Sequence, residues 1–136
     1  MILVDTSIWI DIFRDRQGTL AHTFRNRIRD SIYGLTRFTQ LELLQGSNNE
    51  GEWKKLHRYL STQFYLEASQ DTWVEAARIY FELRRIGRTV NSPIDCCIAQ
   101  VAIENEVVLL HRDHDFSTIA SIRPFHAVYL TADAPG

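Results

Sequence analysis

Two short apolar runs stand out in the pattern of hydrophobic and polar positions along this chain. Residues 2–4 (ILV) and 107–111 (VVLLH) lack the polar–apolar alternation of a half-exposed strand. Continuous runs of this kind are typical of strands buried on both faces of a parallel sheet. Residues 32–36, 63–66 and 124–130 are interpreted as three further strands.

The segments between these strands are expected to be helical. They are residues 6–13, 19–30, 39–46, 50–60, 71–87, 92–105 and 115–122. The clearest helix is 71–87, which Gly87 ends. Its apolar residues share one face at helical spacing: Trp73, Ala76, Ala77, Tyr80 and Leu83. Both Trp9 and Trp73 are expected to pack in the core or at a subunit contact.

Strands that alternate with helices predict an α/β fold with a parallel sheet covered on both faces. The 136 residues contain no repeat, linker or low-complexity segment, so a single domain over residues 1–136 is expected. The hydrophobic fraction of 45% is sufficient for a core without disulfides or a structural metal.

Charge and cysteine usage narrow the class of protein. The formal net charge of −2 argues against a protein that coats nucleic acid through bulk positive charge. Cys96 and Cys97 are adjacent, a spacing that disfavours a disulfide, and they are expected to be reduced in a cytoplasmic protein. The first apolar run has no leading positive charge and no stretch is long enough to span a bilayer, so neither a signal peptide nor a membrane partner is expected.

Four acidic residues fall near the predicted carboxyl edge of the sheet. Asp5 follows the first strand and Asp113 follows the strand 107–111, while Glu42 and Asp95 lie in helices that adjoin strands. Ligands of open parallel sheets bind at this edge. Converging carboxylates repel unless a cation lies between them. Oxygen ligands with no cluster of His and Cys favour Mg²⁺ or Mn²⁺.

Each of these acids also has a purely structural interpretation. Residues 39–42 and 92–95 both fit a capping box, in which the acid closes the first turn of a helix. Asp5 fits a helix N-cap or a turn, and Asp113 fits the start of a turn. The common position of the four acids at one sheet edge favours a shared site.

Three segments resemble PIN-domain proteins, and in particular the VapC family of bacterial toxin–antitoxin ribonucleases. They are ILVDTSIWID at residues 2–11, TQLELLQG at 39–46 and SPIDCCIAQVAIENEVVLLHRDHDFSTIA at 92–120. The resemblance extends over essentially the whole chain. It implies a three-layer α/β/α domain around a short parallel sheet.

The resemblance also implies an activity and partners. The activity is that of a Mg²⁺-dependent endoribonuclease, with Mn²⁺ as a substitute, that cleaves transfer or ribosomal RNA and inhibits translation. The partner is a VapB-type antitoxin that blocks the site and carries a DNA-binding module, so that DNA is contacted only through the antitoxin. Homodimers are usual in the family.

Carried over by position, the catalytic and metal-binding quartet is Asp5, Glu42, Asp95 and Asp113. Asp115 is a second candidate for the fourth place, and it either assists or faces solvent. The number of bound ions stays open.

Further residues are candidates for contact with substrate. Thr6 is expected to contact a ligand oxygen or cap the helix, and Arg112 to contact a phosphate. Three arginines after residue 83 either attract RNA phosphates or complement a helix dipole: Arg84, Arg85 and Arg88.

Two other functional classes are compatible with parts of this sequence. A non-catalytic PIN-like module that binds RNA or protein is the alternative, and the retention of all four acids counts against it. A phosphotransfer domain is disfavoured because Ser7, not an acid, stands two residues after Asp5.

Overall fold

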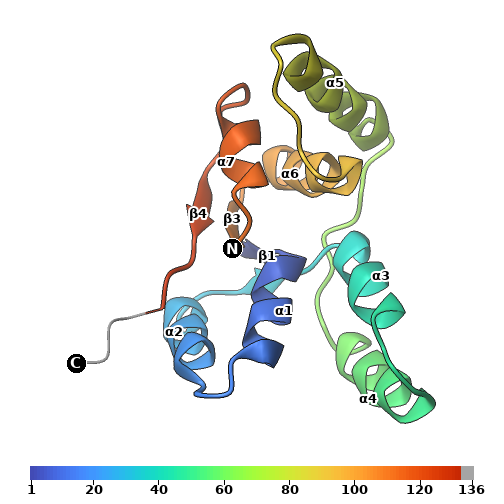
Figure 1. Ribbon diagram of the computed structural model, residues 1–136, viewed down its shortest axis with the longest axis vertical. Coiled ribbons are helices and arrows are strands. Elements are labelled where there is room, and N and C mark those ends of the chain that lie inside the picture. The colour runs from blue at the N-terminus through green and yellow to red at the C-terminus, as the bar shows by residue number, and fades with distance from the viewer. Residues whose placement is uncertain (133–136) are drawn as a thin grey trace.

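Four parallel strands form one sheet at the centre of the protein, in the order β2-β1-β3-β4. Figure 1 shows β1, β3 and β4 of this sheet between the helices. The computed structural model describes residues 1–132. The strands are β1 (Ile2–Val4), β2 (Tyr33–Gly34), β3 (Val108–His111) and β4 (Ala127–Tyr129). In the register of the sheet, Leu3 of β1 pairs with Gly34 on one side and with Leu109 on the other.

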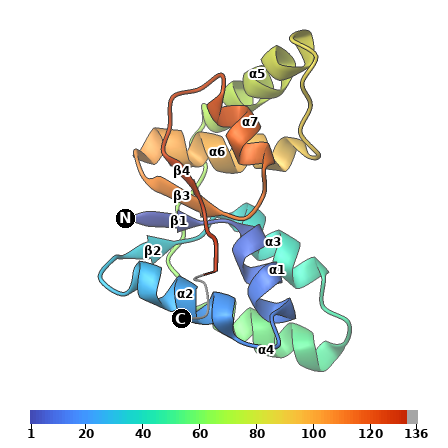
Figure 2. The ribbon, with the colours of Figure 1, turned by 60° about the vertical axis from the view of Figure 1, so that its left-hand side comes forward.

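Helices cover both faces of this sheet, which confirms the predicted three-layer α/β/α architecture. They are α1 (Thr6–Arg14), α2 (Thr19–Ile28), α3 (Arg37–Gln45), α4 (Glu50–Leu60), α5 (Thr72–Arg85), α6 (Pro93–Asn105) and α7 (Asp115–Ala120). Figure 2 shows α5, α6 and α7 on one face and α1 to α4 on the other. None of the helices in the described part of the chain is long and apolar enough to cross a bilayer.

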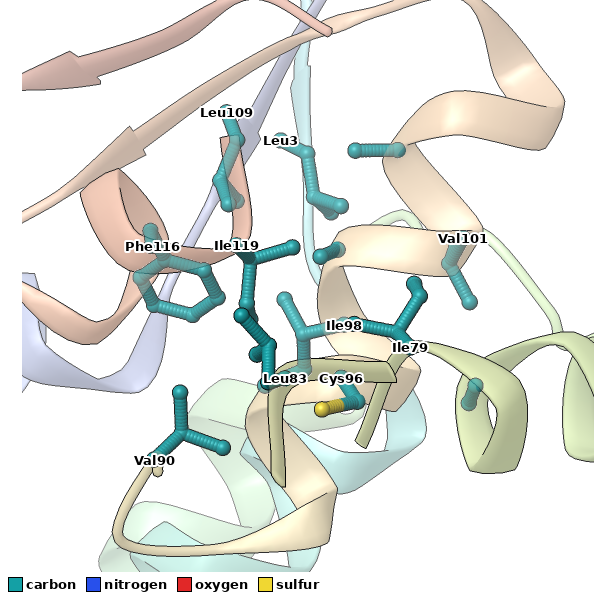
Figure 3. Packing of buried hydrophobic residues seen from close by; sticks show 13 residues of the cluster. Leu3, Ile79, Leu83, Val90, Cys96, Ile98, Val101, Leu109, Phe116 and Ile119 are labelled. Atoms are coloured by element: carbon teal, nitrogen blue, oxygen red, sulfur yellow. The ribbon is translucent and has the colours of Figure 1, made fainter. Parts of the chain in front are cut away.

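The two faces of the sheet support two separate hydrophobic cores, because successive side chains of a strand point to opposite faces. Leu3 and Leu109 pack under α5 to α7 with Ile98 and Phe116 (Figure 3). The neighbouring strand residues Ile2, Val4 and Leu110 pack on the other side, against α1 to α4. The apolar runs at 2–4 and 107–111 are therefore buried on both faces, as predicted.

The predicted strand at residues 63–66 is wrong as a full strand. Only Tyr65 forms a bridge, to Leu35 just beyond β2. The Leu35 amide donates to the Phe64 carbonyl at 2.9 Å, and the Leu66 amide donates to the Leu35 carbonyl at 2.8 Å. Pairing stops there because Thr36, the next residue, already caps α3 and leaves the sheet.

The predicted apolar face of α5 is also partly wrong. Its buried residues are Thr72, Ala76, Ile79 and Leu83, which pack toward α6. Trp73 is 56% exposed, although its ring contacts Phe38 edge-on at 5.7 Å between centroids. Large aromatic residues do not have to enter the core when a neighbouring stripe of smaller residues fits the opposing helix more closely.

Candidate active site

The carboxyl ends of β1 and β3 lie side by side and carry the first two acidic groups. The Asp5 amide donates to the Leu110 carbonyl at 2.9 Å, which fixes the end of β1 against β3. Asp113 follows two residues after β3 ends. The beginnings of α6 and α7 bring Asp95 and Asp115 to the same edge.

Asp5 serves both as a helix cap and as a member of this cluster. It is the N-cap of α1, and its Oδ2 accepts hydrogen bonds from the Ser7 amide at 3.0 Å and the Ser7 hydroxyl at 2.6 Å. Its other oxygen, Oδ1, is buried and has no hydrogen-bond partner among the described residues. Buried polar atoms normally have hydrogen-bond partners, so this oxygen is available to bind a cation or to accept a hydrogen bond from a ligand.

Glu42 is held by a buried hydroxyl rather than by a helix cap. The Thr6 hydroxyl donates to Glu42 Oε1 at 2.8 Å and lies 2.9 Å from Thr39 Oγ1. The capping box at residues 39–42 is wrong, since Thr36 caps α3 by accepting from the Thr39 amide at 3.3 Å. The expectation that Thr6 caps a helix is wrong as well, because Asp5 does so. Thr6 instead orients Glu42 near Asp5.

Three carboxylates form the tightest part of the cluster. Asp95, Asp113 and Asp115 each offer an oxygen within 4.8 Å of the others. Asp113 Oδ1 accepts from the Asp115 amide at 2.9 Å, and Asp115 Oδ2 accepts from the Asn91 amide at 2.9 Å. Ser92 is the N-cap of α6, as predicted. Asp115 therefore lies inside the cluster and does not simply face solvent.

The electrostatics of the cluster show that its acids cannot all ionise freely. Burial raises the pKa of Asp5 to about 6, an effect that the Ser7 hydrogen bonds oppose and the charge of Glu42 reinforces. Burial also raises the pKa of Asp95 to about 8, with further contributions from the charges of Asp5 and Asp113. A divalent cation would remove this repulsion. The all-oxygen donor set and the unpartnered Asp5 Oδ1 therefore fit a hard cation such as Mg²⁺ or Mn²⁺.

Arg112 lies beside the cluster but is already engaged within the protein. Its Nε donates to Asp11 Oδ2 at 2.7 Å, and its NH1 donates to the Leu130 carbonyl at 2.6 Å. Its guanidinium also lies over the Tyr129 ring at 5.5 Å. These contacts tie the end of β4 to α1. If Arg112 contacts a phosphate, its guanidinium has to do so while it also donates to Asp11 and to the Leu130 carbonyl.

The three arginines at the end of α5 are exposed. The guanidinium of Arg84 lies 6.0 Å from the Tyr80 ring centroid, and that of Arg85 lies 5.6 Å from that of Phe81. Arg88 NH1 donates to the Ser121 hydroxyl at 3.0 Å.

Sequence reasoning assigned no site role to Ser7 or Asn91, and it did not predict the contact of His111 with the Asp113 amide. A usable signal existed only for Ser7, because a hydroxyl two residues after an aspartate N-cap is well placed to bond that carboxylate. The Asn91 and His111 contacts depend on how the loops after α5 and β3 are folded.

Comparisons with known proteins agree with this geometry. The family model described as PIN domain matches residues 2–122. The chain is 32% identical over 130 residues to VapC ribonuclease Mb1587 of Mycobacterium bovis and to ribonuclease VapC11 of Mycobacterium tuberculosis. Each alignment covers 93% of this chain and 97% of the relative.

Solved structures share the fold at lower sequence identity. VapBC2 from Rickettsia felis, bound to a promoter DNA fragment, matches with a TM-score of 0.76 and 18% identity, over 96% of this chain and 100% of that chain. VapBC-1 from nontypeable Haemophilus influenzae matches with a TM-score of 0.74 and 20% identity, over 95% and 98%. The chain therefore belongs to the PIN-domain family and, within it, to the VapC ribonucleases.

Proposed function

We propose that this protein is the toxin of a type II toxin–antitoxin system and acts as a Mg²⁺-dependent endoribonuclease on cellular RNA. The observation that carries the proposal is the convergence of five carboxylates at one sheet edge, with Asp5 Oδ1 buried and unpartnered. The five are Asp5, Glu42, Asp95, Asp113 and Asp115. The curated relatives named above are ribonucleases, which supports RNA as the substrate.

The acidic residues of the site are assigned to binding of the cation. The predicted quartet of Asp5, Glu42, Asp95 and Asp113 would hold the cation, together with Asp115, whose carboxylate lies within reach of Asp95 and Asp113. When bound, the cation supplies Lewis-acid polarisation of a phosphoryl oxygen and activation of water for in-line displacement.

Two hydroxyls prepare these acids for that role. The Ser7 hydroxyl holds Asp5 through Oδ2 and leaves the buried Oδ1 without a hydrogen-bond partner, and the Thr6 hydroxyl holds Glu42. Burial raises the pKa of Asp95, which shares a hydrogen bond with Asp115, so that its carboxyl group would have to release its proton in order to hold a cation.

Membership of the VapC ribonucleases also indicates which molecules this protein binds. Solved neighbours include VapBC assemblies with DNA and a toxin–antitoxin complex from Klebsiella pneumoniae. We infer that a VapB-type antitoxin binds this chain and blocks the site, that DNA is contacted through the antitoxin, and that the toxin forms a homodimer. Transfer RNA and ribosomal RNA are both retained as targets whose cleavage would inhibit translation.

The test is cleavage of total cellular RNA by antitoxin-free protein. Wild type is expected to produce discrete fragments with Mg²⁺ or Mn²⁺ and none with a chelator. Asp5→Asn is expected to retain the fold, since asparagine is also a good N-cap, and to lose cleavage. Folded wild-type protein that cleaves no RNA with either metal would favour the alternative of a non-catalytic binding module.

A second prediction separates RNA binding from a helix-dipole role for the arginines around the end of α5. The variant replaces three exposed residues by glutamine: Arg84, Arg85 and Arg88. The logarithm of RNA affinity falls as the logarithm of the salt concentration rises. For single-stranded RNA, each lost phosphate contact is expected to make this slope less steep by about 0.7. Binding is measured in the Asp5→Asn background, which is expected to bind RNA without cleaving it.

The matched control removes three exposed arginines at α2: Arg25, Arg27 and Arg29. This control is expected to leave the salt dependence of RNA binding unchanged. Equal slopes for wild type and the α5 variant, with a lower unfolding free energy for that variant, would assign Arg84, Arg85 and Arg88 to the helix dipole.

A further inference from the structure

His111 is a buried polar residue at the carboxyl edge of the sheet that the proposed chemistry does not use. It is the last residue of β3 and is 1% exposed. Its ring lies 5.0 Å from that of Phe116 and 5.7 Å from that of Tyr129, measured between centroids. Its carbonyl accepts from the Leu130 amide at 2.8 Å. Packing and sheet pairing therefore hold both its backbone and its ring.

One ring nitrogen of His111 contacts the backbone of the acidic cluster. Nδ1 accepts a hydrogen bond from the Asp113 amide at 3.2 Å. Because Nδ1 accepts, the neutral ring carries its proton on Nε2. This contact begins a chain of three hydrogen bonds, each from a backbone amide to a side chain. Nδ1 of His111 accepts from the Asp113 amide and Asp113 from the Asp115 amide, while Asp115 accepts from the amide of Asn91 in the segment before α6.

We propose that His111 is a positioning residue whose Nδ1 orients the Asp113 peptide, so that Asp113 and Asp115 present their carboxylates together to a divalent cation. The proposal rests on the proposed function, because the cation is that of the candidate active site. Residues 112–114 connect β3 to α7, which begins at Asp115, so rotation of the Asp113 peptide would displace the Asp113 and Asp115 carboxylates relative to Asp95. A backbone amide held by a buried and immobile ring resists that rotation.

Three substitutions separate this role from simple filling of the core. His111→Asn keeps an acceptor near the place of Nδ1, His111→Gln moves it to the place of Nε2, and His111→Leu fills the volume with no acceptor. The readout is the affinity for Mn²⁺ and Mg²⁺ alone, measured by calorimetry without RNA. Loss of a group that orients metal ligands typically weakens affinity by about 10–100-fold.

His111→Leu and His111→Gln are expected to show that loss, whereas His111→Asn is expected to stay within about threefold of wild type. The unfolding free energy of each metal-free variant is measured in parallel, because a residue with only a structural role would change stability without this rank order. Equal affinity in the leucine variant and wild type would overturn the proposal, as would equal losses in the asparagine and leucine variants.

A measurement on wild-type protein keeps the proposal testable if a variant does not fold. Nitrogen NMR of metal-free wild type is expected to show an unprotonated His111 Nδ1 with coupling across the hydrogen bond to the Asp113 amide. A proton on Nδ1 would overturn the proposal. Wild type that binds neither cation would contradict the proposed function instead, while the NMR result would still decide whether His111 holds the Asp113 amide.

Discussion

Replacement of Asp95 by asparagine is expected to reduce RNA cleavage by at least about a thousandfold and yet to stabilise the metal-free protein at pH 8. The loss follows because a catalytic cation contributes several kcal/mol to transition-state stabilisation, and about 1.4 kcal/mol corresponds to each factor of ten in rate. The gain in stability follows from the electrostatics of the site. Burial and the charges of Asp5 and Asp113 raise the pKa of Asp95 to about 8 in the folded state.

The sign of the pH effect follows from proton linkage. Between the ordinary aspartate pKa of 3.8 and the folded-state value of about 8, folded Asp95 holds a proton that the unfolded chain has lost. Stability from this group is therefore fully present below pH 4 and is lost as the pH rises to 8. The slope is at most about 1.4 kcal/mol per pH unit for one proton. Asp5, with a folded pKa of about 6, adds to the loss between pH 4 and 6.

Denaturant unfolding in chelator, across pH 4.5 to 8, measures this effect. The free energy of unfolding of Asp95→Asn is expected to fall less steeply with pH than that of wild type. Asp30→Asn is the matched control, because Asp30 is exposed and follows α2. A lower unfolding free energy for Asp95→Asn than for wild type at pH 8 would instead make Asp95 a structural acid of the first turn of α6.

Mg²⁺ or Mn²⁺ is expected to stabilise the wild-type protein, and to do so more strongly at pH 8 than at pH 6. A ligand that binds only the folded state at 100 times its dissociation constant adds about 2.7 kcal/mol to the free energy of unfolding. The effect grows with pH because the cation must displace protons from Asp5 and Asp95, whose pKa values burial has raised.

Unfolding with and without each cation at the two pH values measures the stabilisation, and calorimetry in two buffers counts the protons released. Asp95→Asn is expected to lose most of the stabilisation, whereas Asp30→Asn retains it. Stabilisation that is equal in both variants, or larger at pH 6, would show that the cation binds away from the carboxylate cluster.

Much of the fold could be predicted from the sequence because its signals are local. The continuous apolar runs at 2–4 and 107–111 predicted buried parallel strands, and both strands lie in the centre of the sheet. Ser92 and Pro93 marked the start of α6 correctly. The single bridge at Tyr65 and the exposed Trp73 could not be predicted, since sheet pairing and the fit between α5 and α6 depend on residues far apart in the chain.

Local sequence is sufficient to place the acids at the ends of strands and the starts of helices, because strands and helix caps are encoded within a few residues. How these acids are used depends on contacts that form when the chain folds. The fold turns Asp5 so that one oxygen caps α1 and the other has no hydrogen-bond partner among the described residues, and it places Asp115 beside Asp95. The fold also brings the His111 ring to the Asp113 amide. These features depend on burial and on contacts between distant segments, which raise the pKa values of Asp5 and Asp95 and cannot be inferred from local spacing.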